Sequence, residues 1–546
     1  MDAKPHSPCG LTPIVSVEGL RISFSQSSTA SRVEAVRAID FELTPGCRTG
    51  IIGESGSGKS VTCLALTGLV EHIGGRIDAG RIRTFGCEVL GASEKQLQRI
   101  RKQKTAYIFQ EPMRALTPHL TVADHFRLRY GSLGIRNVSE VRERTAQVLK
   151  EAQLQPDAGM LRSYPRELSG GMAQRVTAAL AFAGEPELLI ADEPATALDA
   201  VTRMRLMETL QEAAASRQAA LLIISHDVGL TAAVTESLLV MKDGKIVERG
   251  STAEIIKGGS CPYTKRLIAA VPSLSAARTV TASPGEDAVL ELRGVTVRYP
   301  NGTEGIRKVS LRFAPGGVTA VAGESGSGKS TLVKACLGLA DPSEGTILVD
   351  GVSTAEMSTR QLQEARRRMQ IVFQNPSGSF NPDLLMRESL QEPLRMLSRM
   401  KEPKRIGVIS ALLRRVGLDV PVLHRFPDQF SGGQKQRMSI TRSLSVSPLI
   451  LFADEPVSSL DVSIQAEVLQ LFRELQRSLG FHLVFITHDI ASAAGIADRM
   501  AVMHRGEIVE SGGIEEILTN AKHPYTRKLL AASAWADIHA RREGMA

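Results

Sequence analysis

At 546 residues, with 43% hydrophobic and 23% charged residues, the chain is long enough for several domains and has an ordinary globular balance. The formal charge of +8 suits an anionic partner such as nucleotide phosphate or a membrane surface, but only 4% of residues are aromatic, so we expect no nucleic-acid partner. The six cysteines form no CxxC pair, which favours a protein of a reducing compartment. No stretch approaches the roughly 18 apolar residues of a membrane span, so if the chain works at a membrane, partner proteins must hold it there.

The first strong pattern along the chain is a predicted strand over 48–52, then the letters GESGSGKS at 53–60, then a predicted helix over 61–70. The same eight letters return at 323–330, between a predicted strand over 318–322 and a predicted helix over 331–340, an offset of 270 (323 − 53). Four later landmarks, SGG, ADEP, a His-Asp pair and PYT, recur at a constant offset of 262 (431 − 169). The chain is therefore a tandem duplication, and two domains replace the three or four that length alone suggests.

Each half of the chain alternates short apolar runs, such as 188–190, 221–224 and 483–486, with longer helical stretches. This alternation predicts an α/β fold, with a mainly parallel sheet and flanking helices in each half. Residues 273–287 are small and polar, which predicts a linker. We therefore expect one domain over 14–272 and a second over 288–534.

The repeated eight-letter segment has the GxxxxGK[ST] pattern, in which glycines let the backbone N–H groups wrap around phosphate oxygens at a helix N-terminus. Lys59 and Lys329 would add a cation at the β and γ phosphates of ATP, and Ser60 and Ser330 would offer a hydroxyl to Mg²⁺. The predicted ATP-binding residues are Gly53, Glu54, Ser55, Gly56, Ser57, Gly58, Lys59, Ser60, Gly323, Glu324, Ser325, Gly326, Ser327, Gly328, Lys329 and Ser330.

An apolar strand ending in Asp-Glu follows in each half, LLIADE at 188–193 and ILFADE at 450–455. Parallel strands present their carboxyl ends at the edge where the phosphates would bind. Adjacent strand residues point to opposite sides, so the two acids should have different roles. We expect Asp192 and Asp454 to hold Mg²⁺ through water, and Glu193 and Glu455 to orient and deprotonate the attacking water.

The segments LSGGM at 168–172 and FSGGQ at 430–434 resemble the signature motif of the ABC ATPase family, and the resemblance extends from about residue 15 to about residue 534. It implies two P-loop ATPase domains, each with a helical signature subdomain, whose Ser-Gly-Gly opens a helix and receives the γ-phosphate of an ATP bound by the opposing domain. Met172 and Phe430 stand where the family usually has glutamine and leucine. The signature residues expected to contact nucleotide are Ser169, Gly170, Gly171, Ser431, Gly432 and Gly433.

Three further pairs of residues match family positions. Gln110 and Gln374, which end the apolar runs AYIFQ and QIVFQ, look like the glutamines that sense the γ-phosphate and Mg²⁺. His226 and His488 look like the switch histidine, since each lies 33 residues after its glutamate (226 − 193 and 488 − 455). Phe24 and Tyr299 look like the aromatic residue that stacks on adenine, with packing in the core as an equal alternative.

Two features resemble one branch of the family, the oligopeptide, dipeptide and nickel importers. They are the extended segments after the glutamines, QEPMRALTP and QNPSGSFNP, and the repeated CPYTKRL and HPYTRKL, in which proline can start a helix. The resemblance implies an ATPase that binds two ATP and Mg²⁺ per chain and docks on two membrane permease subunits, with a solute-binding protein outside. It places the chain at the cytoplasmic face of a bacterial inner membrane, with peptides as the expected solute and nickel, glutathione-like molecules or sugars as alternatives. Cys261 stands nearly alone in this region, so we expect no iron–sulfur cluster.

Two other functions stay open at this point. A soluble tandem ABC protein that acts on the ribosome normally carries a long charged helical arm between its domains, and residues 273–287 are too short and too neutral for one. An ATPase of a non-transport assembly, of the phosphonate-breakdown type, resembles the same branch and is not separated from it by the sequence.

Overall fold

The computed structural model describes residues 12–25, 32–196, 198–276, 288–458 and 460–539. The chain forms two compact units. Unit 1 is built from residues up to Val271, and unit 2 from Pro272–Asp537, except that Asp199–Val201 group with unit 2 and the residues from Ile538 onward with unit 1. Residues 277–287 of the proposed linker lie outside the described part of the chain.

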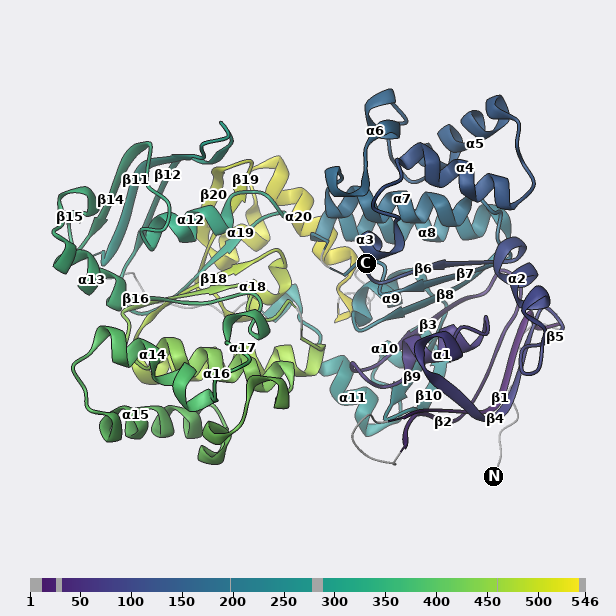
Figure 1. Ribbon diagram of the computed structural model, residues 1–546. Helices are drawn as coiled ribbons and strands as arrows, with labels where there is room; N and C mark the ends of the chain where they lie inside the picture. Colours follow the sequence, from purple (N-terminus) through teal and green to yellow (C-terminus); the bar gives the residue numbers. More distant parts are fainter. Residues whose placement is uncertain (1–11, 26–31, 197, 277–287, 459, 540–546) are drawn as a thin grey trace. The chain divides into compact units, whose positions relative to one another are not determined.

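The centre of unit 1 is a six-stranded sheet of order β10-β9-β3-β8-β7-β6 (Figure 1), in which neighbouring strands run parallel apart from the antiparallel pair β9 and β10. Parallel pairing brings the carboxyl ends of β3, β6, β7 and β8 to one edge, where the predicted site residues follow. These strands span Arg48–Ile52 (β3), Thr105–Ile108 (β6), Leu188–Asp192 (β7), Ala220–Ser225 (β8), Ser237–Lys242 (β9) and Lys245–Ser251 (β10).

Unit 2 repeats this arrangement in the order β16-β17-β18-β13-β19-β20. Its central strand β13 pairs in parallel with β18 on one side and β19 on the other, as β3 does with β8 and β9 in unit 1. The strands span Val318–Ala322 (β13), Met369–Val372 (β16), Ile450–Asp454 (β17), His482–Thr487 (β18), Arg499–His504 (β19) and Glu507–Gly513 (β20).

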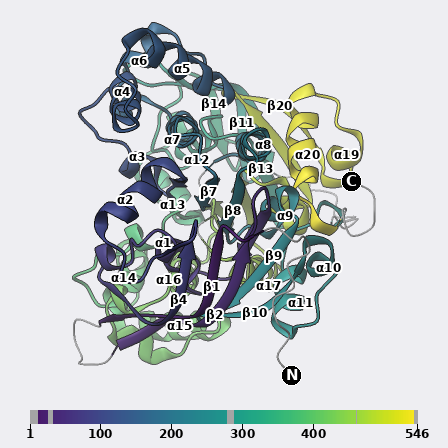
Figure 2. The ribbon, with the colours of Figure 1, turned by 90° about the vertical axis from the view of Figure 1, so that its right-hand side faces the viewer.

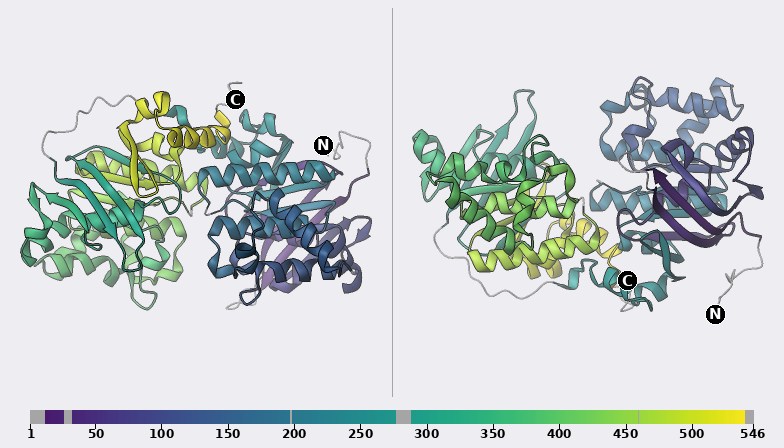
Figure 3. Two further views of the ribbon diagram at one scale, coloured as in Figure 1. Left: turned by 90° about the horizontal axis from the view of Figure 1, so that it is seen from above. Right: turned by 60° about the horizontal axis from the view of Figure 1, so that its bottom comes forward.

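Each unit also contains a four-stranded antiparallel sheet, a layer that the sequence patterns did not predict. Figure 2 and the right-hand view of Figure 3 show the purple strands β1, β2 and β4 of unit 1 as one layer. Its buried side chains join those of the parallel sheet in one core, as Leu20 and Ile51 do in unit 1. The strands span Val15–Ser25 (β1), Arg32–Leu43 (β2), Gly75–Thr84 (β4), Cys87–Glu88 (β5), Leu290–Arg298 (β11), Glu304–Phe313 (β12), Glu344–Val349 (β14) and Val352–Ser353 (β15).

A group of helices lies beside the edge strand of each parallel sheet, α4–α7 near β6 in unit 1 and α14–α16 near β16 in unit 2 (Figure 1). The predicted helical signature subdomain is therefore confirmed. The helices of unit 1 span Lys59–Ala65 (α1), Glu94–Gln103 (α2), Pro112–Ala115 (α3), Val122–Ser132 (α4), Val138–Glu151 (α5), Ala158–Arg162 (α6), Gly170–Phe182 (α7), Ala200–Arg217 (α8), Val228–Val234 (α9), Thr252–Ile256 (α10) and Pro262–Ala269 (α11).

The helices of unit 2 span Lys329–Cys336 (α12), Thr359–Arg368 (α13), Met386–Leu397 (α14), Glu402–Arg415 (α15), Gly432–Leu444 (α16), Val462–Leu479 (α17), Ile490–Ile496 (α18), Ile514–Asn520 (α19) and Pro524–Trp535 (α20). The predicted strands over 48–52 and 318–322 are confirmed, and both PYT segments start a helix with proline at its first position. The helices predicted over 61–70 and 331–340 are shorter, since they end just before Gly68 and Gly338, both of positive φ. No helix in the described ranges is both long and apolar enough to cross a bilayer.

Candidate functional site

The GESGSGKS loops join β3 to α1 and β13 to α12, as the phosphate-loop pattern requires. Gly58 and Gly328 precede the helices in the left-handed conformation, with φ of 96° and 104°. A Cβ at either position would lie 2.4 Å from a backbone oxygen, of Ala35 in unit 1 and Gly305 in unit 2. Only glycine can adopt this positive φ and also fit so close to a backbone oxygen. The backbone conformation therefore requires glycine at both positions.

The lysine of each loop is buried, with 6% of its surface exposed. Lys59 Nζ donates to the carbonyl oxygens of Gly53 and Glu54, both at 2.8 Å, and Lys329 Nζ donates to those of Gly323 and Glu324 at 2.8 and 2.7 Å. Burial lowers the pKa of Lys329, opposed by the charges of Glu455 and Asp454. A lysine is thus held inside each loop, near the carboxylates at the end of β7 or β17, the second strand along the sheet from the loop strand.

The aspartates predicted to hold Mg²⁺ end their strands and meet the loop serines. Ser60 Oγ donates to Asp192 at 2.9 Å, and Ser330 Oγ donates to Asp454 at 3.5 Å. Asp192 also accepts a bond of 2.9 Å from the Tyr107 hydroxyl. Burial raises the pKa of both aspartates, an effect that the bonds from Ser60 and Tyr107 oppose at Asp192. A serine hydroxyl and a carboxylate meet in each unit, the oxygen donors that Mg²⁺ prefers.

The predicted general bases, Glu193 and Glu455, each lie against the predicted switch histidine. His226 Nδ1 is 2.6 Å from Glu193 Oε2, and His488 Nδ1 is 3.2 Å from Glu455 Oε2. Burial opposes ionisation of Glu193, but the bonds and charge of His226, with a bond from Thr196, outweigh it and lower the pKa of Glu193. An ionised carboxylate beside a half-buried imidazole can take a proton from water.

The backbone at these glutamates differs from the prediction. The strands end at Asp192 and Asp454, so strand alternation does not separate the two acids. Instead Glu193 and Glu455 adopt positive φ, 50° and 44°, a conformation that non-glycine residues seldom take. The turn directs each glutamate toward its histidine and stores backbone strain of about 1 kcal/mol or more.

The predicted sensing glutamines lie beyond their strands, which is a small correction. Strands β6 and β16 end at Ile108 and Val372, two residues before Gln110 and Gln374, and both glutamines are exposed. Gln374 Nε2 donates to Glu455 Oε2 at 2.9 Å, which joins it to the acid and histidine of unit 2. In unit 2 the predicted sensing glutamine is therefore in direct contact with the predicted general base.

The signature segments open helices as predicted. Ser169 and Ser431 are the N-cap residues of α7 and α16, and the hydroxyl of each accepts the backbone N–H three residues later, at 3.3 Å. Both serines are exposed. Each helix therefore presents free N–H groups and a partial positive charge at the surface of its unit, an arrangement suited to an anion.

The candidate adenine-stacking residues are both half-buried. Phe24 is the last residue but one of β1, packs partly against the core of unit 1 and lies close to Gly75. The Tyr299 hydroxyl is 3.1 Å from Thr331 Oγ1, two residues after the loop lysine. Tyr299 thus lies beside the phosphate loop, while its role toward adenine stays a prediction.

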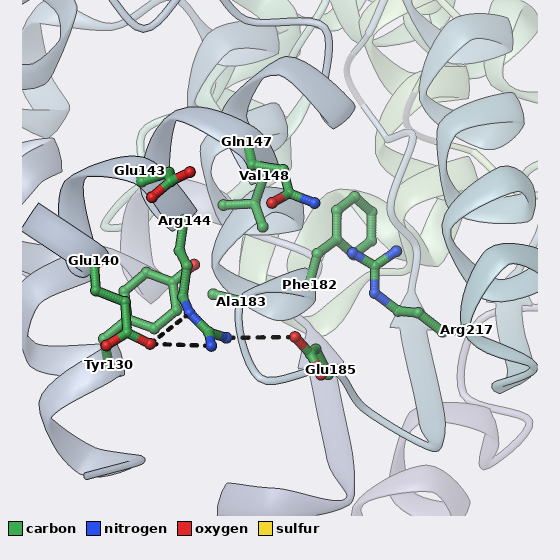
Figure 4. A pocket seen from close by; sticks show the side chains of 10 residues that line it. All are labelled: Tyr130, Glu140, Glu143, Arg144, Gln147, Val148, Phe182, Ala183, Glu185 and Arg217. Atoms are coloured by element: carbon green, nitrogen blue, oxygen red, sulfur yellow. Dashed lines mark hydrogen bonds and ion pairs between the residues drawn. The ribbon is translucent and has the colours of Figure 1, made fainter. Parts of the chain in front are cut away.

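A hollow of about 410 Å³ lies among α4, α5 and the end of α7, away from the loops. Figure 4 shows Arg144 crossing it to pair with Glu140 and Glu185, at 3.0 and 3.5 Å. Arg144 is thus paired with two carboxylates of the lining, while Arg217 pairs with Glu151 at 2.6 Å. Elsewhere among the described residues, no three or more His, Cys, Asp or Glu side chains gather as a metal would require.

Sequence reasoning missed two residues that touch the acids. Tyr107 bonds to Asp192, and Thr196 Oγ1 donates to Glu193 Oε2 at 2.9 Å. Tyr107 has a signal in hindsight, because it is a polar side chain in the apolar run AYIFQ, where QIVFQ has Ile371. Thr196 has none, since hydroxyl residues are common in turns.

Comparison with known proteins agrees with this geometry. The family model described as ABC transporter matches residues 36–196 and 306–458, and the model described as the C-terminal region of oligopeptide/dipeptide transporters matches 247–293 and 509–545. The glutathione import ATP-binding protein GsiA of Salmonella typhimurium is 36% identical over 98% of this chain and 92% of its own length. GsiA of Escherichia coli K12 is 37% identical over 96% and 90%. The chain therefore belongs to the ABC transporter family, as an ATP-binding and ATP-hydrolysing subunit with two ATPase domains.

Proposed function

We propose that this ATPase powers an importer for short peptides or peptide-like solutes. The observation that carries the proposal is the completeness of both units, since each has its own loop lysine, aspartate, glutamate and histidine in place. The match to the C-terminal region of oligopeptide/dipeptide transporters follows each of the two ABC transporter matches along the chain. Relatives named for glutathione import favour a small peptide-like solute over a metal ion or a sugar.

In this proposal each unit carries out its chemistry with the same four side chains. The loop lysine and backbone N–H groups bind the β and γ phosphates and neutralise their charge. Glu193 or Glu455 orients the attacking water and takes its proton. His226 or His488 lies at 2.6 or 3.2 Å from that glutamate, which orients the base, and in unit 1 the contact with His226 also lowers the pKa of Glu193. ATP hydrolysis would then run at two sites per chain.

The residues around each loop fit Mg²⁺. Ser60 with Asp192, and Ser330 with Asp454, would hold the ion, with Gln110 and Gln374 as further oxygen donors. Bound there, the ion would supply positive charge to the phosphate oxygens. Burial is the main cause of the raised pKa of Asp192 and of Asp454. A cation bound in each unit would stabilise the ionised form of its aspartate.

The proposed partners are two permease subunits, which would hold the chain at the cytoplasmic face of the membrane and receive solute from an external binding protein. Exposed apolar side chains beside the sensing glutamines support such docking, namely Phe109 and Met113 in unit 1 and Phe373 in unit 2. We also propose that Ser169–Gly171 and Ser431–Gly433 each contact a nucleotide bound by the other unit, as the family resemblance implies.

The test is reconstitution of the chain with its permeases in liposomes. Addition of the binding protein loaded with glutathione or a dipeptide should stimulate ATP hydrolysis and drive uptake, and Lys59→Ala, Lys329→Ala should abolish both. A chain that copurifies with metabolic enzymes or ribosomes and with no permease would instead support one of the two rival functions.

Nucleotide stoichiometry tests the two-site part of the proposal. The Glu193→Gln, Glu455→Gln double variant should bind ATP without hydrolysing it, so with Mg²⁺ it should trap two nucleotides on a monomeric chain. Trapping that begins only after two chains pair would contradict it. Mass photometry together with radiolabelled ATP measures both quantities.

A further inference from the structure

The PYT segments are a repeated motif to which the hydrolytic site assigns no role. They begin α11 and α20, and their tyrosines, Tyr263 and Tyr525, are 6% and 7% exposed. Buried tyrosine hydroxyls need a partner. In both units that partner is the phosphate loop of the same unit.

The Glu54 N–H donates to the Tyr263 hydroxyl at 3.3 Å, and the Glu324 N–H donates to the Tyr525 hydroxyl at 2.9 Å. These donors lie 209 and 201 residues from their tyrosines. The same contact thus forms twice although the intervening chain differs in length by eight residues. The recurrence of this contact in both units argues that it has a role in the protein.

The bonded N–H belongs to a peptide group that the loop lysine also holds. Lys59 Nζ donates to the Gly53 carbonyl at 2.8 Å, and that carbonyl shares one planar peptide with the Glu54 N–H. Tyr263 and Lys59 therefore bind the two ends of one rigid unit. Lys329 and Tyr525 do the same at the Gly323–Glu324 peptide, at 2.8 and 2.9 Å.

The loop has little room to take another position. A Cβ at Gly53 would lie 2.2 Å from the Met241 carbonyl oxygen, so the loop start is pressed against the end of β9. The next residue of β9, Lys242, places its ammonium 5.1 Å from the Tyr263 ring centroid. In unit 2, the ring of His504 lies 3.9 Å from that of Tyr525. Each tyrosine is thus held between strand end and loop.

The segment is fastened at its start as well. Glu248 accepts the backbone N–H of Cys261 at 3.2 Å, and Glu510 accepts those of Lys522 and His523 at 2.7 and 3.1 Å. A carboxylate at a helix N-terminus satisfies free N–H groups and the helix dipole. Each tyrosine therefore projects from a fixed helix start, which makes its hydroxyl a fixed reference point for the loop.

We infer that Tyr263 and Tyr525 are positioning residues for ATP, through which the C-terminal segment of each unit sets the orientation of the phosphate loop and its lysine. The inference rests on the proposed assignment of these loops to the phosphates. Because the loop contacts phosphate before and during hydrolysis, loss of the bond weakens binding in both states alike. KM for ATP should rise while kcat changes little.

The experiment compares Tyr263→Phe, Tyr525→Phe and the double variant with the wild-type chain. Phenylalanine keeps the ring and its packing and removes only the acceptor oxygen. We expect the KM for ATP of the double variant, and its equilibrium Kd for ATP, to rise about 3- to 10-fold, the range for one lost hydrogen bond. The value of kcat should stay within about twofold.

Tyr130→Phe is the matched control, because Tyr130 is also buried, at 1% exposure, but lies in the helical subdomain of unit 1. It should leave KM unchanged. An unchanged KM and Kd in the double variant would overturn the inference, as would a loss of kcat and Tm equal to that of Tyr130→Phe. The Lys59→Ala, Lys329→Ala double variant tests the assignment of the loops to the phosphates separately from the role of the tyrosines. If that variant still binds ATP normally, the assignment of the loops is wrong, whatever the tyrosine variants show.

Discussion

Unit 1 and unit 2 carry identical eight-letter loops, yet they hold the neighbouring aspartate differently. Asp192 accepts bonds of 2.9 Å from both Ser60 and Tyr107. Among the described residues, Asp454 accepts one side-chain bond, from Ser330 at 3.5 Å, and Ile371 occupies the strand position of Tyr107. The carboxylate of unit 1 is therefore held in one orientation by two hydrogen bonds, while that of unit 2 is held more loosely.

The proposed general bases, Glu193 and Glu455, also differ in their contacts. Glu193 is held by Thr196 and His226, at 2.9 and 2.6 Å. Glu455 is held by His488 at 3.2 Å and by Gln374 at 2.9 Å. In unit 2 the proposed base Glu455 is thus bonded to Gln374, which begins the exposed segment that follows β16. Matching motifs do not guarantee matching sites, because residues outside the motifs set how the acids are oriented.

The largest expected effect comes from replacing the bases one at a time. Glu193→Gln and Glu455→Gln should each reduce hydrolysis at their own site by about 10²- to 10⁴-fold, with ATP binding retained, because a general base is lost without a change of shape. Single-turnover hydrolysis with trapped ATP measures each site. Full turnover at both sites in either variant would show that the glutamates are not the bases.

A smaller effect should follow from Tyr107→Phe, which removes a bond to the aspartate that unit 2 lacks from the start. Loss of this support should raise the Mg²⁺ concentration for half-maximal hydrolysis by about tenfold, as is typical when a group behind a metal ligand is removed. Measured in the Glu455→Gln background, in which hydrolysis in unit 2 is impaired, the effect reports on the site of unit 1. Ile371→Val, assayed in the Glu193→Gln background, is the matched control and should leave the Mg²⁺ requirement of site 2 unchanged.

The smallest expected effect concerns stability without Mg²⁺. Burial raises the pKa of Asp192 and Asp454, so ionisation at neutral pH costs the folded state free energy, and asparagine should relieve that cost. Asp454→Asn should raise Tm by about 2 to 4 °C, and Asp192→Asn by less, because Ser60 and Tyr107 already stabilise its charge. Thermal unfolding in EDTA measures both.

The sign of the pH dependence checks the same point. An aspartate whose folded pKa is raised binds its proton more readily in the folded state, so the wild-type chain gains stability as pH falls through that pKa. Asparagine does not titrate. The gain in Tm from Asp454→Asn should therefore shrink as pH is lowered, and a gain that grows toward acid pH would contradict the burial argument.

Much of the site could be predicted from sequence because its parts are local. A loop between a strand and a helix, an Asp-Glu pair after an apolar run and Ser-Gly-Gly at a helix start are all read within about ten residues. The extent of α1 and the strand ends before Gln110 and Glu193 were less well predicted, since element boundaries depend on a few competing hydrogen bonds.

By itself, the sequence determined the duplication, the two phosphate loops, the acids and the helix starts, because each follows from spacing and backbone demands along one segment. Only the tertiary structure decided which side chains complete the sites. Tyr107 meets Asp192 across 85 residues, and Tyr263 meets the loop across 209. Such bonds depend on which strands pair and where helices pack, so the physical reason lies in long-range burial, which brings distant polar groups together and then requires that they satisfy one another.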